Sequence, residues 1–217
     1  MKNYTTVSLI ISILFILSCG NKNSEQQKPE TIAVADTVKT IIHNHNYASN
    51  KYSAVDASPM DMIYYPVEYY KMNVANQITT PLIIRIIYSR PHLNGRVLFK
   101  DVLNFDEPWR LGANEATEIQ FFREVTIQNK KIKPGRYILY SIPNEKNWVI
   151  VLNNNIDTWG LRQDTSKDLF RFNAIAKIVD HHTEYFTMIF DESKMGADLI
   201  IAWDNYEIRL PIDFSIN

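Results

Sequence analysis

From Pro81 to the C-terminus, the chain is a succession of short strand patterns separated by turn residues. The segment YEIRLPI shows the pattern, because Ile208, Leu210 and Ile212 alternate with charged residues and a proline. Successive side chains of a strand point to opposite faces, so such a segment buries one face. No helical period of useful length occurs after residue 81. Short strands at intervals of about ten residues predict an all-β fold, here a single antiparallel β-sandwich domain of jelly-roll-like type.

Turn residues subdivide this region. Asn129-Lys130 and Asp204-Asn205 each predict a tight turn that closes a hairpin, and His181-His182 predicts a turn between two strands. Two segments, Tyr137–Ile142 (YILYSI) and Leu199–Trp203 (LIIAW), are apolar at consecutive positions. Such strands have two apolar faces. We therefore expect one face to line the core and the other to be covered by a loop, a second layer or a partner.

The first residues are typical of a secretion signal. A mostly apolar run without charged residues, Val7–Leu17, is closely followed by the only cysteine of the chain, Cys19. At a rise of about 1.5 Å per residue, the run is too short to cross a hydrocarbon core of about 30 Å. We therefore expect residues 1–18 to be a lipoprotein signal peptide and Cys19 to be acylated, as in the lipobox of bacterial lipoproteins. The alternative is a simple secreted protein with a stray cysteine near its cleavage site.

The residues after Cys19 predict a location and a tether. Gly20 follows the cysteine instead of the aspartate that commonly retains lipoproteins at the inner membrane, which favours the outer membrane. Residues 19–58 are predicted to be a flexible tether, because their polar composition cannot bury enough surface to offset chain entropy. Residues 59–217 then form the β-sandwich domain. The tyrosine-rich segment Ser58–Val74 is expected to enter it as an extended segment laid across the sandwich.

Charge and histidine placement narrow the possible partners. The net charge is −1 with both signs scattered, whereas nucleic-acid-binding proteins carry a basic stripe. We therefore expect no nucleic-acid partner. His43 and His45 lie in the predicted tether and His181-His182 in a predicted turn, whereas structural zinc takes about four ligands and catalytic zinc about three. We interpret these histidines as solvated and expect no metal and no cofactor.

The segment EPWRLGANEATEI has the most unusual composition in the domain. Gly112 and Asn114 tolerate a positive φ, which suits a sharp turn into the following strand. One interpretation is a corner, in which Trp109 plugs one end of the sandwich and Arg110 pairs with Glu115. The other is a polar pocket lined by Arg110, Asn114 and Glu115, with Glu115 as an acid or base. We favour the corner.

The loop YSRPHLNGR raises the same question, because Arg90, His92 and Arg96 project from it. If this loop and the corner share one end of the sandwich, the three side chains form a mixed cluster with Arg110 and Glu115. Such a cluster suits an anionic ligand, such as a carboxylate or a phosphate-bearing envelope glycan. The predicted ligand-binding residues are Arg90, Arg96, Trp109, Arg110 and Asn114, and the candidate catalytic residues are Glu115 and His92.

Several phrases of the domain resemble one protein family. They are YSRPHLNGRVLF (Tyr88–Phe99), PWRLGANEAT (Pro108–Thr117), VTIQNKKIKPGRYILYSIP (Val125–Pro143), WVIVLN (Trp148–Asn153), DTWG (Asp157–Gly160) and LIIAWDN (Leu199–Asn205). Together they resemble the bacterial envelope proteins grouped as domain of unknown function 2911, over roughly Ser58 to Ile212. One departure is FKDVLNFDEPW, where relatives often have a glycine pair and a tyrosine-glycine. The resemblance implies a fold and an envelope location, and it brings no established activity or catalytic residues.

The hypothesis is a lipoprotein anchored to the bacterial outer membrane through Cys19, periplasmic or surface-facing, that acts as a binding or structural module. Its ligand would be an envelope glycan, a peptide or a small anion. A glycan binder predicts exposed aromatics such as Trp109, Trp148 or Trp159. One alternative is an envelope hydrolase with Glu115 and His92 as acid-base groups. Another is a scaffold subunit of an envelope assembly, which predicts an exposed apolar patch.

Overall fold

The structure is a computed structural model that describes residues 56–214. The predicted signal peptide (1–18), the predicted acylation site Cys19 and most of the predicted tether (19–58) lie outside the described residues. The strands are β1 Met60–Tyr65, β2 Ile84–Ser89, β3 Glu118–Phe121, β4 Val125–Ile127, β5 Lys130–Ile132, β6 Gly135–Ile142, β7 Asn147–Asn153, β8 Asp168–Glu192 and β9 Gly196–Asp213. The helical elements are α2 Tyr69–Val74, the π-helical turn η1 Leu98–Val102 and the 3₁₀ turn η2 Thr165–Lys167. Within residues 56–214, no helix is long and apolar enough to cross a membrane.

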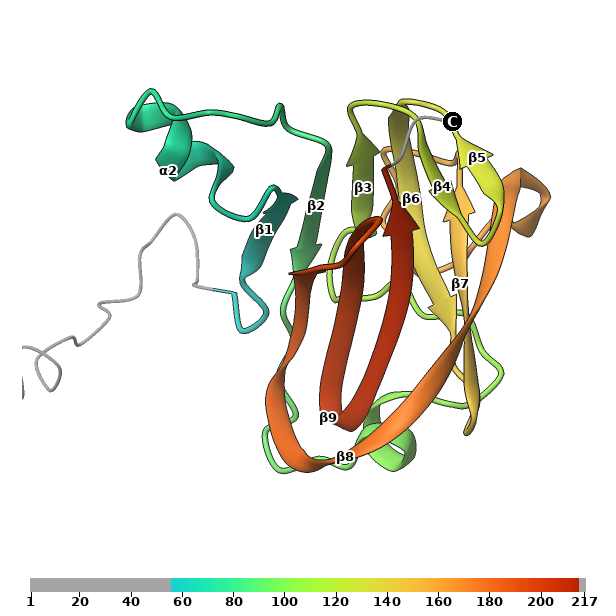
Figure 1. Cartoon of the computed structure of the whole chain (residues 1–217). Helices are drawn as coiled ribbons and strands as arrows, with labels where there is room; N and C mark the ends of the chain where they lie inside the picture. The colour runs from blue at the N-terminus through green and yellow to red at the C-terminus, as the bar shows by residue number, and fades with distance from the viewer. Residues whose placement is uncertain (1–55, 215–217) are drawn as a thin grey trace, which may run out of the picture. The chain divides into compact units, whose positions relative to one another are not determined.

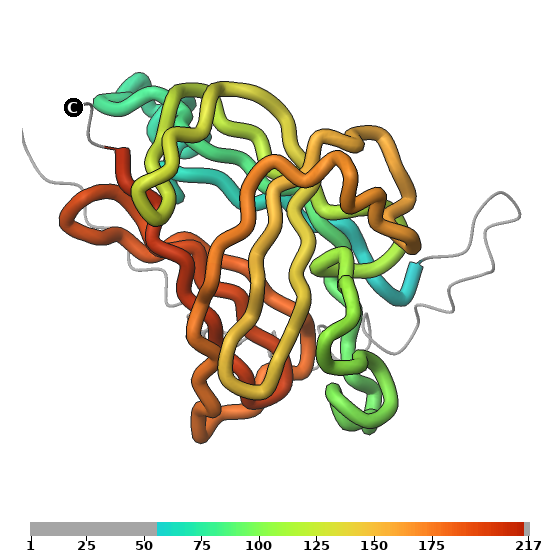
Figure 2. Tube along the Cα trace, turned by 90° about the vertical axis from the view of Figure 1, so that its right-hand side faces the viewer, coloured from blue at the N-terminus to red at the C-terminus, as the bar shows by residue number. Residues whose placement is uncertain are grey.

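The strands of the described region form one antiparallel sheet with the order β1-β2-β3-β6-β7-β8-β9-β4-β5 (Figure 1). This confirms the prediction of an all-β antiparallel fold. The two separate sheets of a sandwich are not confirmed, because strand β8 continues from one part of the sheet into the other. Its residues up to Ile175 pair with β7, and those from Ala176 onward pair with β9. Figure 2 shows the β6–β7 hairpin with the first part of β8 alongside it.

The two long strands correct two predicted turns. His181-His182 lies within β8, and Asp204-Asn205 lies within β9, so neither pair closes a hairpin. Asp204 has a φ of 55°, the left-handed conformation that turn residues tolerate, but here it accompanies an irregularity in the ladder. Register shifts separate the pairs Ile178↔Tyr206 and Thr187↔Ala202, because β8 holds more residues than β9 between them. The irregularity thus replaces the predicted turns.

The two parts of the sheet share one core, and Tyr88 of β2 connects them. Its hydroxyl accepts a hydrogen bond from the Met188 amide at 3.0 Å and donates one to the Met188 carbonyl at 3.4 Å. Its ring meets Phe186 edge-on, with centroids 5.6 Å apart. Burial raises the pKa of Tyr88 to about 12, while the hydrogen bond to Met188 opposes the rise, so the hydroxyl stays protonated at neutral pH. Tyr88 therefore links β2 to β8 across the core.

The outer face of β6 is covered by the loop between β7 and β8. Ile138 and Tyr140 are buried although they point away from the core residues Tyr137 and Leu139. The Tyr140 hydroxyl donates to the Asp168 carboxylate at 2.9 Å, at the end of this loop. Arg136 of β6 also donates to Asp157 of the loop at 2.9 Å. The sequence left open whether a loop, a second layer or a partner covers the second apolar face of YILYSI. The structure shows a loop there.

The segment Ser58–Val74 is only partly the extended segment that its composition predicted. Residues Met60–Tyr65 are extended as β1, which pairs with β2 at the edge of the sheet. A cis peptide bond joins Tyr65 to Pro66, and the chain then forms α2. Figure 1 shows α2 standing apart from the sheet beside β1 and β2.

Candidate functional site

The corner after β2 and η1 is built around a buried tryptophan. Trp109 is 8% exposed, and its backbone exchanges two hydrogen bonds with Ser141 of β6, at 2.7 and 2.9 Å. Its indole stacks on Trp203 with centroids 5.4 Å apart and meets Trp148 and Phe186 edge-on. The indole N–H donates to the Gly112 carbonyl at 3.2 Å. Trp109 thus occupies the core, as the corner interpretation expected, and leaves no face for a ligand.

The turn itself depends on a close approach of two backbones. A Cβ on Gly112 would lie 2.9 Å from the Ser89 carbonyl oxygen, and its φ of 156° also disfavours other residues. Asn114 has a φ of 58°, so the predicted positive φ is confirmed at both positions. Leu111 also has a positive φ, 52°, which its residue type did not indicate. The buried Thr117 hydroxyl donates to the Leu111 carbonyl at 2.6 Å and helps hold that conformation.

Arg110 lies in this corner without a hydrogen-bond partner among the described residues. Its Nε is buried and unsatisfied, and burial lowers the pKa of the guanidinium while the charge of Glu115 opposes that shift. The predicted Arg110–Glu115 salt bridge does not form within 4 Å, and Glu115 is exposed. Asn114 instead donates to Asp56 at 2.7 Å. A half-buried cation without a hydrogen-bonded counter-ion is the arrangement that an anionic group would complete.

The loop between β7 and β8 packs directly against Arg110. The Ala116 amide donates to the Thr158 carbonyl at 3.2 Å. A Cβ on Gly160 would lie 2.8 Å from the Ala116 Cβ and 3.2 Å from the Arg110 Cβ, so only glycine fits there. The neighbouring Trp159 is 52% exposed. Of the tryptophans proposed as glycan contacts, Trp159 is therefore exposed, whereas Trp109 and Trp148 are buried.

Arg90 is held within the fold. Its guanidinium donates to the Phe186 carbonyl at 3.1 Å, to the Thr187 hydroxyl at 2.8 Å and to Asp61 at 3.2 Å. It therefore ties the end of β2 to β1 and β8. Because its donors already have partners, Arg90 is poorly placed to hold a ligand.

The other two residues of this loop are also occupied. Arg96 donates to the carbonyls of Leu93 and His92, both at 2.8 Å, and so stabilises its own turn. His92 stacks on Tyr185 with ring centroids 5.2 Å apart, and its Nδ1 lies 3.8 Å from Glu184. No hydrogen bond or ion pair joins His92 to Glu115 in the described part of the chain. The expected five-residue cluster is thus divided between two separate groups of contacts.

A cluster that the sequence did not reveal lies on β8 and β9. His182 Nδ1 is 3.1 Å from Asp204, and its Nε2 is 3.2 Å from Glu184. Hydrogen bonds to Glu184 and then to Asp204 raise the pKa of His182. A hydrogen bond from the Asn94 amide has the largest effect in lowering the pKa of Glu184, and the hydrogen bond with His182 lowers it further. His182 and Glu184 are two residues apart, which places both on one face of a strand, but the signal is readable only once β8 is known to be continuous.

Metal binding finds no support in this region. Among residues 56–214, no group of three or more histidine, cysteine or acidic side chains is arranged to hold a metal ion. Both ring nitrogens of His182 already face carboxylates. The cluster is therefore better described as a set of ion pairs across the bend of β8.

Comparison with known proteins identifies the family. The family model described as "Protein of unknown function (DUF2911)" matches residues 71–212. Among curated proteins and among solved structures, no significant match is found. The match includes the tryptophan-arginine corner, all of β8 and all but the last residue of β9, and it confirms the resemblance to this family in the sequence motifs. Since it covers more than half of the chain, the protein belongs to the family of proteins of unknown function DUF2911.

Proposed function

We propose that this protein is an envelope lipoprotein, anchored to the bacterial outer membrane through acylated Cys19, whose domain binds an anionic group at Arg110. The apolar run Val7–Leu17 followed by Cys19 supports the anchor. The state of Arg110 supports the binding site. The two parts of the proposal are independent, so each has its own test.

One observation carries the binding proposal. Arg90 and Arg96 donate hydrogen bonds to other groups of the fold. Arg110, in contrast, has a buried, unsatisfied Nε and no hydrogen-bond partner in the described region. Leaving a buried donor unpaired costs about 1–3 kcal/mol. A carboxylate or phosphate offers the planar or clustered oxygens that a guanidinium binds best. We therefore expect the ligand to carry such a group.

The surroundings of Arg110 favour a glycan over a free ion. Trp159 adjoins Gly160, which lies against Arg110, and the indole is half exposed. An exposed aromatic ring provides an apolar face on which a sugar ring can stack, while Arg110 takes its acidic substituent. The ligand class that fits both side chains is an acidic saccharide of the envelope.

Calorimetric titration tests the site, with glucuronate and glucose 6-phosphate as charged probes and glucose as the neutral one. We expect the charged sugars to bind and Arg110→Ala to weaken them by about 10- to 100-fold, because a charge-assisted hydrogen bond contributes about 1.5–3 kcal/mol. Lys177→Ala serves as the control, because it removes an exposed cation on β8, away from the corner. Equal affinities for the two variants would refute the Arg110 site.

The anchor is tested by growing cells with an alkyne-labelled fatty acid. The wild-type protein should incorporate the label and stay in the outer-membrane fraction, whereas Cys19→Ala should not be labelled. An unlabelled wild-type protein would refute acylation without affecting the Arg110 result.

A further inference from the structure

The segment Pro66–Pro81, here called the arm, contributes nothing to the core. None of its residues is buried, and α2 within it has no buried side chain. Its exposed apolar residues include Val67, Tyr70 and Val74, the last being 88% exposed at the end of α2. Figure 1 shows this segment projecting beside β1 and β2. The ring of Tyr70 meets Tyr64 of β1 edge-on, with centroids 4.7 Å apart. A helix of this length with so little tertiary packing gains little from its own hydrogen bonds, so contact with another surface would stabilise it.

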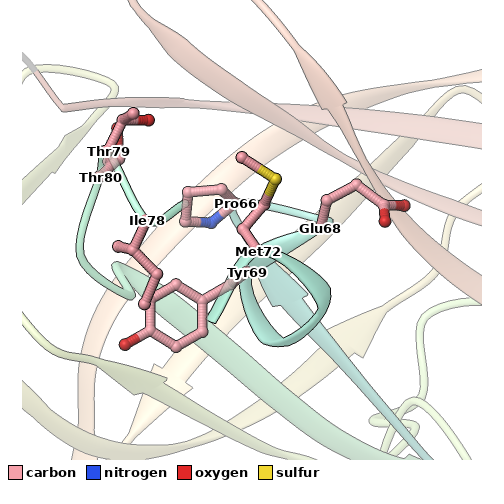
Figure 3. Close-up of a pocket in the computed structure, with 7 residues that line it drawn as sticks. All are labelled: Pro66, Glu68, Tyr69, Met72, Ile78, Thr79 and Thr80. Carbon is pink, nitrogen blue, oxygen red and sulfur yellow. The ribbon is translucent and has the colours of Figure 1, made fainter. Parts of the chain in front are cut away.

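The other side of the arm is mostly apolar, although Glu68, Thr79 and Thr80 also line it. A pocket of about 210 Å³ lies between α2 and the chain that follows it. Figure 3 shows Tyr69, Met72 and Ile78 around Pro66 in its lining. Apolar side chains therefore occur on more than one side of the arm.

Charges on the arm are compensated. Glu68 and Lys71 are its charged residues, and they form an ion pair at 2.8 Å. The nearest acidic residue of β1, Asp61, pairs with Arg90 at 3.2 Å. An apolar, tyrosine-bearing surface with no net charge is compatible with the boundary between lipid headgroups and acyl chains, where tyrosine is enriched.

The position of the arm in the chain selects this partner over others. Residues 20–55 would link Cys19 to the described domain, and about 36 residues reach at most about 120 Å when fully extended. As a flexible coil, as their composition predicts, they would span about 35 Å on average. The tether enters the domain just before β1, so the arm lies close in sequence to the point of attachment. An anchored domain therefore meets the bilayer at high local concentration.

We propose that the arm rests on the lipid bilayer, with Val74, Tyr70 and Val67 in its interfacial region. This inference rests on the proposed acylation of Cys19. It assigns the arm a lipid surface as its partner and orients the domain so that β1 and β2 lie toward the membrane. Lipid contact through one tyrosine and two valines is shallow and reversible, which suits a domain already held by its anchor.

The test uses the mature lipidated protein reconstituted in vesicles of phosphatidylethanolamine and phosphatidylglycerol. Cys19 is the only native cysteine, so Val74→Cys provides a single site for an environment-sensitive fluorophore once Cys19 is acylated. Ile175→Cys is the matched control, because Ile175 is also apolar and exposed, at 68%, on the β7–β8 side. Thermal melting of both variants confirms that each is folded.

Vesicles with spin-labelled lipid chains should quench the label at residue 74 at least threefold more than the label at residue 175. Equal quenching at both positions overturns the arm proposal while vesicle flotation still supports the anchor. Protein that fails to float shows that the anchoring proposal itself is wrong, and the arm proposal falls with it. A change in the fluorescence of the label at residue 74 that depends on protein concentration and not on vesicles would indicate a second copy as the partner. That result also overturns the proposal.

Discussion

The corner around Trp109 and the arm Pro66–Pro81 both carry aromatic side chains, yet these side chains pack differently in the two regions. In the corner, Trp109 packs against three other aromatic rings and its polar atoms have partners within the fold. In the arm, no residue is buried. The unusual composition of EPWRLGANEATEI therefore reflects a structural role in the core. The arm, in contrast, leaves its apolar side chains exposed.

The two regions also differ in which polar groups have partners. Arg110 has a buried Nε without a partner among the described residues, as do the Ser141 hydroxyl and the Trp148 indole N–H beside it, and of these three groups Arg110 alone carries a charge. The two proposals therefore concern groups that the fold leaves without partners: Arg110 in the corner and the exposed apolar side chains of the arm. Substitutions in the two regions should separate these roles.

The largest effect is expected from Trp109→Ala, which should lower the free energy of unfolding by about 3–5 kcal/mol, since it leaves a cavity in the aromatic core. Trp159→Ala removes an exposed tryptophan and should change it by less than about 0.5 kcal/mol. Urea denaturation measures both. Similar losses for the two variants would mean that the corner is no better packed than the loop beside it.

Gly112→Ala should cost about 1–3 kcal/mol of unfolding free energy, because the new methyl group meets the Ser89 carbonyl oxygen. Gly95→Ala is the matched control, since Gly95 also has a positive φ, 76°, but open space around it. The control should cost about 1–2 kcal/mol from backbone strain alone, and Gly112→Ala should cost more than the control. A cost for Gly112→Ala no greater than that of the control would contradict the close approach.

A smaller effect concerns pH and the bend of β8. The pKa of His182 is raised in the folded protein by Glu184 and then Asp204. The stabilisation is fully present below the unfolded-state pKa of about 6.5 and is lost as the pH rises through the higher folded-state pKa. His182→Gln should therefore remove part of the fall in melting temperature above pH 6.5. His181→Gln, without an ion pair in the described region, should leave that fall unchanged, and equal curves for both variants would exclude this role.

The smallest effect is expected in the arm. Val74→Asp should change the free energy of unfolding by less than about 0.5 kcal/mol, because Val74 packs against nothing in the domain. The same urea denaturation measures it. A loss of about 2 kcal/mol would show that the arm contributes to the core and would remove the contrast with the corner.

Alternation in the sequence was sufficient to predict the strands and their inward residues. Ile208, Leu210 and Ile212 are all buried, as predicted. Turn positions were less accurate, because turn residues also occur at strand irregularities: Asp204 has a positive φ inside β9. The β4–β5 turn lies one residue earlier than predicted, since the positive φ values fall on Gln128 and Asn129. Local preferences cannot decide between a turn and an irregularity, whereas long-range pairing does.

For the site, local chemistry predicted the backbone better than the side-chain partners. Gly112 and Asn114 have the expected positive φ. Two of the three partners of Arg90, Phe186 and Thr187, lie far along the chain, so its pairing depends on the course of β8. A sequence shows which side chains can donate, but only the folded chain shows which donors remain free. Arg110 could be named from the sequence as a candidate, while its lack of a partner could not be foreseen.

One strand crosses from the first part of the sheet to the second, and this has a consequence for how the domain opens. Phe172 lies where β8 pairs with β7, and Met188 lies where it pairs with β9. Because the same strand belongs to both parts of the sheet, loss of β8 from one part also destabilises the other part. We therefore expect the two parts not to unfold separately. Amide hydrogens at both ends of β8 should then exchange through one concerted unfolding event, at rates set by the same free energy.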